Sequence, residues 1–253
     1  MTRDRAEARL LSRILRIGML LALLGQIAWS FRPEPSRAQT DQQAQGQALY
    51  EANCSTCHGL QAEGTANGPS LQNAGPAAVD FMLSTGRMPL ANPGDQPVRD
   101  EPKFTPEQTA AIVAYVETIA PGGEPIPTVD PAAGDLARGA EVFLNTCAGC
   151  HGAGATGDSV GGGQIAPTIN PADPTQIGEA IRIGPGLMPR FGPETIDQAD
   201  LDSLAAYLLW IRDHGEDGGL QLGRVGAVAE GLVIVVVGLG LMILFLRLTG
   251  AKT

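Results

Sequence analysis

The sequence predicts a mainly α-helical protein in which two small tandem domains precede a C-terminal transmembrane helix. Three observations support this fold class. A five-residue motif occurs twice, segments with a helical spacing of apolar residues flank each copy, and a long apolar run lies near the end of the chain. A chain of 253 residues can hold one or two domains. The repetition of the motif favours two.

The repeated motif is C-x-x-C-H, which is the attachment signature of c-type haem. The two thiols bond to the porphyrin vinyl groups, and the histidine beside them becomes the proximal iron ligand. The motif therefore predicts two covalently bound haem c groups. The two copies are Cys54-Ser55-Thr56-Cys57-His58 and Cys147-Ala148-Gly149-Cys150-His151. The attachment residues are thus Cys54, Cys57, Cys147 and Cys150, and the axial histidines are His58 and His151.

A C-x-x-C pair is also compatible with a redox-active disulfide or with half of a zinc site. A zinc site needs ligands that converge, whereas each pair here is followed at once by its own histidine. A redox disulfide requires neither a second copy nor that histidine. The two motifs contain all four cysteines, so none is left for a structural disulfide. These features favour haem.

The net charge of −10 is unevenly distributed along the chain. Five arginines lie within the first sixteen residues, whereas residues 39–221 carry 23 acidic and 7 basic side chains, a net charge of −16. Such an acidic surface repels phosphates, so no nucleic-acid partner is expected. The charge is compatible with steering of a basic partner, but a solvated surface is the simpler interpretation.

Residues 1–38 are expected to form a signal peptide or an N-terminal anchor. Ile17 to Phe31 is uncharged and follows the arginine cluster, as the apolar region of an export signal does. Small residues at Ser36 and Ala38 suit cleavage after Ala38. The run is short for a membrane span, although a retained helix could extend while Arg16 snorkels. Cleavage and retention both export the following domains, as c-type haem attachment requires.

Residues 39–120 are expected to form the first haem domain. Ala44 to Asn53 is predicted to be a helix that leads into the first motif. Phe104 to Ala120 is predicted to be a second helix, with Thr105 as its N-cap and Pro106 in its first turn. The apolar face of that helix consists of Ile112, Tyr115, Val116 and Ile119.

Residues 121–134 are rich in proline and glycine and are predicted to be a linker. Proline favours extended polyproline geometry, so the linker should act as a semi-rigid spacer. Residues 135–213 repeat the pattern as a second haem domain. Ala137 to Thr146 leads into the second motif, and Asp197 to Arg212 is the closing helix. Its buried face is expected to carry Leu201, Leu204, Tyr207, Leu208 and Ile211.

Residues 225–246 are strongly apolar apart from Glu230 and are predicted to cross the membrane as a helix of about 33 Å. Arg247 and Lys252 follow the run and place the C-terminus in the cytoplasm. The arginine-rich start is cytoplasmic by the same rule, so both haem domains are expected on the extracytoplasmic side of the cell membrane. Glu230 is expected near the outer interface, with a polar contact to a partner helix as the alternative.

Several positions recur at matching places in the two halves. Gly46 and Gly139 both lie eight residues before the first haem cysteine. Tyr50 and Phe143 both lie four residues before it, where a helical side chain could pack on the porphyrin. Each half also has a Met-Pro pair between its motif and its last helix. These pairs are Met88-Pro89 and Met188-Pro189.

With these features, each half resembles the class I cytochromes c. The resemblance implies that the methionine of the Met-Pro pair is the distal iron ligand, which assigns Met88 to the first haem and Met188 to the second. Isolated methionines are more often core residues, but recurrence before proline favours ligation. Met82 competes for the first haem and has no counterpart in the second half.

The same resemblance implies a role for a proline between each motif and its Met-Pro pair. Gly68-Pro69-Ser70-Leu71 and Ala166-Pro167-Thr168-Ile169 match in position. In class I cytochromes c, the carbonyl of this proline accepts the proton of the proximal imidazole and so fixes its tautomer. That implies contacts from Pro69 to His58 and from Pro167 to His151. A simple loop proline is the alternative.

Ligation by histidine and methionine leaves the iron no open coordination site and raises its reduction potential. This is the chemistry of an electron carrier, so no catalytic residue is expected on this chain. A dihaem peroxidase or a small-molecule sensor needs an open iron, and a peroxidase typically has a second histidine ligand. The one spare histidine, His214, is expected to be exposed at a helix C-terminus.

The order of the segments resembles the dihaem cytochrome c subunit of the actinobacterial-type cytochrome bc1 complex, a menaquinol–cytochrome c reductase. The resemblance covers residues 46–246. Its most specific parts are residues 160–167, 173–177 and 184–191 in the second half. The glycine-rich stretch that the family carries before the anchor is reduced here to residues 218–223.

This resemblance implies that the chain takes electrons from the Rieske iron–sulfur protein and passes them, haem to haem, to a terminal oxidase. The implied partners are the Rieske and cytochrome b subunits and the oxidase, held in one supercomplex of the aerobic respiratory chain. The chain would be the electron-carrying subunit of a translocase. The alternatives are an electron-transfer subunit of a periplasmic dehydrogenase or of an oxidase, although dihaem oxidase subunits usually place the anchor first.

Overall fold

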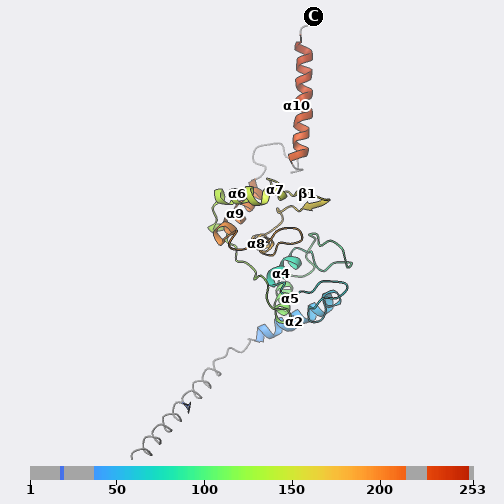
Figure 1. Cartoon of the computed structure of the whole chain (residues 1–253), viewed down its shortest axis with the longest axis vertical. Coiled ribbons are helices and arrows are strands. Elements are labelled where there is room, and N and C mark those ends of the chain that lie inside the picture. The colour runs from blue at the N-terminus through green and yellow to red at the C-terminus, as the bar shows by residue number, and fades with distance from the viewer. Residues whose placement is uncertain (1–17, 20–36, 215–226, 251–253) are drawn as a thin grey trace, which may run out of the picture. The chain divides into compact units, whose positions relative to one another are not determined.

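The computed structural model describes residues 18–19, 37–214 and 227–250 (Figure 1). These parts are predominantly helical, which confirms the predicted fold class, and from Gln45 onward they belong to one compact unit. Most of the predicted signal or anchor segment, residues 1–38, lies outside the described residues. The reduced glycine-rich stretch at 218–223 lies outside them as well.

The first domain contains four described helices, and its closing helix begins where the sequence predicts. The Thr105 hydroxyl accepts a hydrogen bond from the Gln108 amide, and the Gln108 side chain accepts one from the Thr105 amide. This capping box satisfies two of the free amides at the helix start. The helices are α2 (Arg37–Asn53), α3 (Ser55–His58), α4 (Pro76–Ser84) and α5 (Pro106–Ile119).

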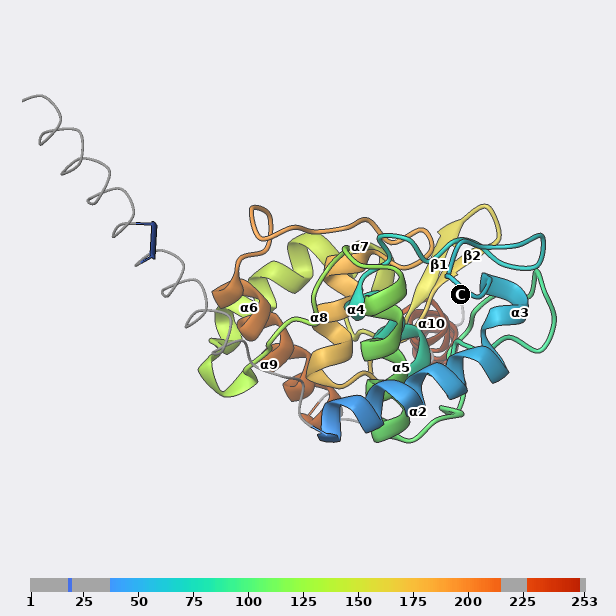
Figure 2. The same ribbon diagram turned by 90° about the horizontal axis from the view of Figure 1, so that it is seen from below.

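The core of this domain forms where α2 crosses α5 (Figure 2). Gly46 lies against the backbone of Ala111, and the rings of Tyr50 and Tyr115 lie 5.6 Å apart. Tyr50 is completely buried in this core. The buried cluster consists of Tyr50, Ala62, Leu83, Ile112, Tyr115, Val116 and Ala120.

The second domain repeats this plan with a different entry into its haem motif. The predicted helix 137–146 is α-helical only as far as Val142, after which residues Phe143–Cys147 form a π-helical turn. Such turns concentrate at functional sites, and this one ends on the first haem cysteine. The remaining elements are α6 (Leu136–Val142), α7 (Ala148–His151), β1 (Asp158–Gly161), β2 (Gln164–Ala166), α8 (Pro174–Ile183) and α9 (Gln198–His214).

The crossing of α6 with α9 matches the crossing in the first domain. Gly139 lies against the backbone of Ser203, and the rings of Phe143 and Tyr207 lie 5.7 Å apart. Strands β1 and β2 form an antiparallel hairpin after the motif. The buried cluster consists of Val142, Phe143, Ala155, Ile177, Ile181, Ile196, Leu201, Leu204, Leu208 and Ile211.

The linker departs near its two ends from the extended geometry that its prolines predict. Gly122 and Gly123 have φ of 105° and 74°, and Pro131–Ala133 form a 3₁₀ turn. The linker also contacts both domains. The Ala77 amide donates to the Glu124 carbonyl over 3.1 Å, and the Asp130 amide donates to the Asp202 carboxylate over 2.8 Å. Contacts with the domains, together with its prolines, therefore constrain the linker.

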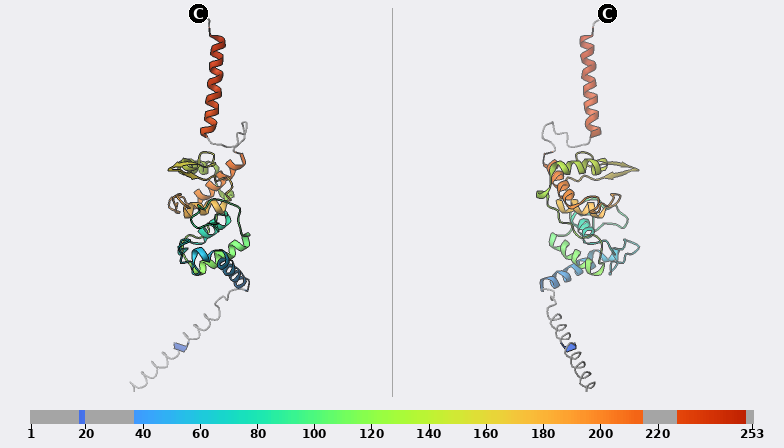
Figure 3. Two further views of the ribbon diagram at one scale, coloured as in Figure 1. Left: turned by 90° about the vertical axis from the view of Figure 1, so that its right-hand side faces the viewer. Right: turned by 60° about the vertical axis from the view of Figure 1, so that its left-hand side comes forward.

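The C-terminal helix α10 (Ala227–Thr249) is one continuous helix (Figure 3). Within the described residues, its segment Gly231–Thr249 is the one stretch long and apolar enough to cross a membrane. None of that segment is buried, so it is not a core helix of a soluble domain. The apolar segment begins and ends later than the predicted residues 225–246, so Glu230 precedes it.

Candidate haem sites

In the first motif, a single helical turn brings the cysteines and the histidine together. The Cys57 and His58 amides both donate to the Cys54 carbonyl, over 3.1 and 2.9 Å. The turn is α3, and it follows α2 directly, because the Cys54 amide donates to the Tyr50 carbonyl over 2.8 Å. In the second motif, α7 follows the π-helical turn and ends as α3 does, since the amides of Gly59 and Gly152 donate to the carbonyls of Ser55 and Ala148.

In both domains the histidine ring contacts the carbonyl of the proline that is predicted to accept its proton. His58 Nδ1 lies 2.7 Å from the Pro69 oxygen, and His151 Nδ1 lies 2.9 Å from the Pro167 oxygen. A carbonyl only accepts hydrogen bonds, so the proton is assigned to Nδ1. Nε2 then keeps a free lone pair, which an axial iron ligand requires.

A glycine turn holds each of these loops against its histidine. The amides of Gly64 and Gly157 donate to the carbonyls of His58 and His151, over 2.7 and 2.9 Å. The two glycines have φ of 86° and 87°, which residues with a Cβ rarely adopt. A Cβ on Gly64 would also stand 2.6 Å from the Ser70 amide nitrogen. The matching geometry shows that the same type of glycine turn positions both histidines.

The structure places each Met-Pro methionine on the same core as the first cysteine of its motif. Cys54 and Met88 are half-buried and pack on the first core, and Cys147 and Met188 do so on the second. Around the first core the other half-buried apolar residues are Leu49, Leu71, Val79, Phe104 and Ile119. Around the second they are Val129, Ala148, Ile169, Ala172, Phe191 and Tyr207.

The residues fit a covalently held haem better than a zinc ion. In the described parts of the chain, no three histidine, cysteine or acidic side chains are placed to share a metal ion. Burial, with the neighbouring thiol, raises the pKa of Cys54 to about 11 and that of Cys147 to about 11. Free thiols at these two positions would therefore be protonated near neutral pH. Half-buried apolar side chains, a thiol pair and a fixed imidazole suit a porphyrin.

The spare histidine, His214, belongs to α9. Its ring stacks on Trp210 with centroids 5.4 Å apart, and its Nδ1 lies 3.1 Å from the Trp210 carbonyl. The side chain is exposed at the helix end, as the sequence predicts. It therefore has a structural partner outside either core.

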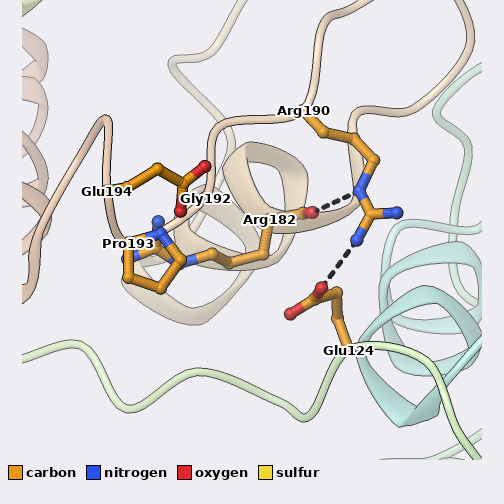
Figure 4. Close-up of a pocket in the computed structure, with 6 residues that line it drawn as sticks. All are labelled: Glu124, Arg182, Arg190, Gly192, Pro193 and Glu194. Carbon is orange, nitrogen blue, oxygen red and sulfur yellow. Dashed lines mark hydrogen bonds and ion pairs between the residues drawn. The ribbon is translucent and has the colours of Figure 1, made fainter.

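Two arginines hold the loop that carries Met188 (Figure 4). The Arg182 guanidinium donates to the carbonyls of Phe191 and Ile196, over 2.9 and 2.8 Å. Arg190 donates to the Arg182 carbonyl over 3.1 Å and pairs with Glu124 of the linker over 2.6 Å. The linker thus fastens the methionine loop, a role that its composition does not reveal.

The polar contact between the two domains, where α4 and α8 lie side by side, is not predicted from the sequence. Gln176 bonds to Ser84 and to Arg99 there, and the carboxyl groups of Asp80 and Glu179 meet. No local sequence signal points to this contact, because the burial of Glu179 is visible only in the folded chain.

Comparisons with known proteins match both domains. Residues 43–120 match the cytochrome c family, and residues 134–208 match the family described as cytochrome c oxidase, cbb3-type, subunit III. Both matched regions are therefore cytochrome c domains, which confirms the resemblance to cytochromes c. Because cytochrome c domains attach haem covalently, the chain is a haem c protein.

Three relatives illustrate the similarity, and two of them match over most of the chain. The cytochrome bc1 complex cytochrome c subunit of Corynebacterium diphtheriae is 32% identical over 240 residues, which cover 85% of this chain and 84% of the relative. The subunit of the same name from Mycobacterium tuberculosis is 33% identical over 253 residues, 94% of this chain and 89% of the relative. The cbb3-type cytochrome c oxidase subunit CcoP of Cereibacter sphaeroides is 28% identical over 192 residues, 69% and 61% of the two chains.

Proposed function

Because the chain belongs to the family of cytochrome c subunits of the cytochrome bc1 complex, we propose that it relays electrons from the Rieske iron–sulfur protein to a terminal oxidase. Membership of this family already makes it an electron-transfer component of a redox complex. The proposal adds the direction of transfer and the partners at each end. It further assigns the chain to a quinol–cytochrome c reductase, a translocase, as its electron-carrying subunit.

The proposal assigns one haem c to each domain. Haem c supplies a one-electron couple between Fe(III) and Fe(II). The first is attached at Cys54 and Cys57 and the second at Cys147 and Cys150, with His58 and His151 as proximal ligands and Met88 and Met188 as distal ligands. The observation that carries this assignment is the contact between imidazole and proline carbonyl, repeated at 2.7 and 2.9 Å. It leaves the same nitrogen free for iron in both domains.

With both axial positions filled, the chain's own residues position the haems and exclude other ligands. The Pro69 and Pro167 carbonyls hold the imidazole tautomers, and the half-buried apolar side chains limit access of water. A closed iron favours electron transfer over turnover of peroxide or binding of a small molecule. Failure of the reduced protein to bind carbon monoxide would support this reading, and rapid binding would favour a peroxidase or a sensor.

The proposal also places the chain in the membrane. Helix α10 anchors it, the haem domains lie on the extracytoplasmic side and the C-terminus lies in the cytoplasm. Protease added to intact spheroplasts should degrade the haem domains and leave a C-terminal tag protected. The reverse pattern would contradict the orientation.

Mild-detergent purification with subunit identification tests the partners. We expect the Rieske protein and cytochrome b to copurify with this chain, and a quinol to reduce both haems in a reductive titration. Replacing Cys54 and Cys57 by alanine should leave one haem per chain, and replacing Cys147 and Cys150 should leave the other. Copurification with a dehydrogenase alone would overturn the proposal.

A second candidate is an electron-transfer subunit of a terminal oxidase. It is favoured by the match of residues 134–208 to the subunit III family of cbb3-type oxidases and by the similarity to CcoP. This candidate predicts that oxidase subunits copurify without a Rieske protein. The same purification therefore distinguishes the two candidate functions.

A further inference from the structure

The two domains meet through a cluster of polar side chains between α4 and α8. The Gln176 amide donates to the Ser84 carbonyl and hydroxyl, both over 3.3 Å, and its oxygen accepts from Arg99 over 2.7 Å. Gln176 also belongs to the capping box of α8 with Asp173. The interface is therefore polar and specific at the N-terminal end of α8.

One turn further along α8, Glu179 has 0% of its surface exposed. Among the described residues no donor lies within hydrogen-bond distance of either of its carboxylate oxygens. The polar group that faces it is the carboxyl of Asp80 in α4, across the domain interface. Two carboxyl groups form a hydrogen bond only when one of them carries a proton.

The surroundings of Glu179 disfavour a second negative charge. Burial raises the pKa of Glu179 to about 10, and the charges of Asp80 and Asp173 act in the same direction. Burial also raises the pKa of Asp80. Removing water from a carboxylate costs more than removing it from the neutral acid, so the protonated form is favoured here.

The nearby arginines do not supply the missing positive charge at Glu179. Arg99 donates a hydrogen bond to Gln176. Burial lowers the pKa of Arg99, and the charge of Asp173 partly offsets that effect. The Arg87 guanidinium lies 4.8 Å from the centre of the Phe81 ring, and its buried Nη1 has no hydrogen-bond partner among the described residues. Neither guanidinium lies within hydrogen-bond distance of Glu179, so a proton is the remaining way to neutralise the carboxyl pair.

We propose that Asp80 and Glu179 share one proton across the domain interface, and that this proton-binding site holds α4 of the first domain against α8 of the second. With one proton, Glu179 donates to an ionised Asp80. Without it, two carboxylates repel each other in a buried site. Docking of the two domains is therefore coupled to the uptake of one proton. This inference does not depend on which partners exchange electrons with the chain.

The sign of the pH dependence follows from the raised affinity for the proton. When the domains separate, Glu179 returns to water and is ionised above about pH 4.3. The docked state keeps the proton up to about pH 10. Between these limits, each rise of one pH unit should weaken docking by up to about tenfold, because separation releases one proton.

Infrared spectroscopy of the haem-loaded full chain in mild detergent detects the shared proton directly. At pH 8 we expect the carbonyl band of a protonated carboxylic acid, and we expect Glu179→Gln to remove it. Glu117→Gln is the matched control, since Glu117 is exposed on α5 and its loss should leave the band unchanged. Identical acid bands in the parent and in Glu179→Gln would overturn the proposal.

Hydrogen exchange tests the coupling to docking, with each variant compared with the parent at the same pH. Protection of α4 and α8 amides should fall in the parent by at least about tenfold between pH 6 and pH 9. In Glu179→Gln this protection should not fall, because the glutamine amide donates to Asp80 at every pH.

In the infrared experiment, Asp80→Asn should shift loss of the Glu179 acid band to lower pH. An unshifted acid band in Asp80→Asn would exclude Asp80 as the partner. Equal pH dependence of amide protection in the parent and in Glu179→Gln would exclude the coupling to docking.

Discussion

Gly46 in α2 lies so close to Ala111 in α5 that a Cβ atom on Gly46 would overlap the Ala111 carbonyl oxygen. Gly139 in α6 stands in the same relation to Ser203 in α9. The recurrence of glycine eight residues before each motif therefore has a packing cause. The helix that enters each motif touches the closing helix of its domain through the backbone, and only glycine leaves room for that contact.

We expect Gly46→Ala and Gly139→Ala to loosen the crossing of their own domains. The helices would have to move apart, which should cost about 1–3 kcal/mol of unfolding free energy, as overpacking generally does. Thermal unfolding of the haem-loaded chain measures the loss. Gly154→Ala is the control, because its Cβ would meet only the Thr156 methyl carbon, at 3.7 Å. Unchanged midpoints in both variants would contradict the tight crossings.

Met88→Leu and Met188→Leu should each remove one distal iron ligand. Leucine has a similar volume but no thioether, so each variant should lose about half of the absorption that reports the bond between methionine and iron. The affected haem should also fall in reduction potential and begin to bind carbon monoxide. Met82→Leu is the matched control. If Met82→Leu removed the signal and Met88→Leu did not, the ligand of the first haem would be Met82.

Arg138 and Asp200 join α6 to α9 by two parallel hydrogen bonds. Arg138 Nε lies 2.6 Å from Asp200 Oδ1, and Nη2 lies 2.8 Å from Oδ2. The hydrogen bonds and charge of Arg138 hold the pKa of Asp200 below its usual range. A lowered carboxyl pKa stabilises the folded state above the unfolded value of about 3.9, and this contribution is lost as the pH falls through the folded value.

We therefore expect Arg138→Gln to lower the thermal midpoint of the second domain at pH 7. The difference from the parent should shrink as the pH falls below about 4. Lys103→Gln is the control, since the pair of Lys103 with Asp100 is exposed and 3.5 Å long, and such pairs contribute little. A difference that persists undiminished at low pH would mean that Arg138 acts through packing alone.

The sequence predicts the elements whose signals are local. Helix α5 begins at Pro106, one residue after its predicted cap Thr105, because the capping box and the proline lie within four residues of each other. The closing helix of the second domain is likewise found, since its apolar residues recur every three or four positions along α9. The haem motifs need only five consecutive residues each. The spacing of the two cysteines and the histidine indicates haem attachment whatever the surrounding fold.

Features that depend on distant contacts are not predictable in this way. Glu179 looks like an ordinary surface glutamate in sequence, yet it is fully buried in the folded chain, where α8 packs against α4 of the other domain. The π-helical turn after Val142 has no distinguishing composition. The hairpin of β1 and β2 is exposed on both strands, so it lacks the alternation of apolar residues that marks a strand.

Tyr50 offers the clearest test of how the first motif is supported. Its hydroxyl donates to the Gly59 carbonyl, directly after His58, over 2.8 Å. The ring is completely buried, and that burial raises the pKa of Tyr50 to about 12. The second domain has Phe143 at the equivalent position, which has no hydroxyl, so this side chain cannot form the same hydrogen bond there.

We expect Tyr50→Phe to lower the unfolding free energy of the first domain by about 1 kcal/mol, because the Gly59 carbonyl loses a buried donor. The neutral phenol stabilises the fold fully below the unfolded pKa of about 10, and this contribution falls as the pH rises toward 12. The difference between parent and variant should therefore be constant from pH 6 to about pH 9 and decrease above it. Thermal unfolding followed at each haem measures it, and the second domain serves as the internal control. A loss shared equally by both domains, or one that grows with pH, would contradict this role of Tyr50.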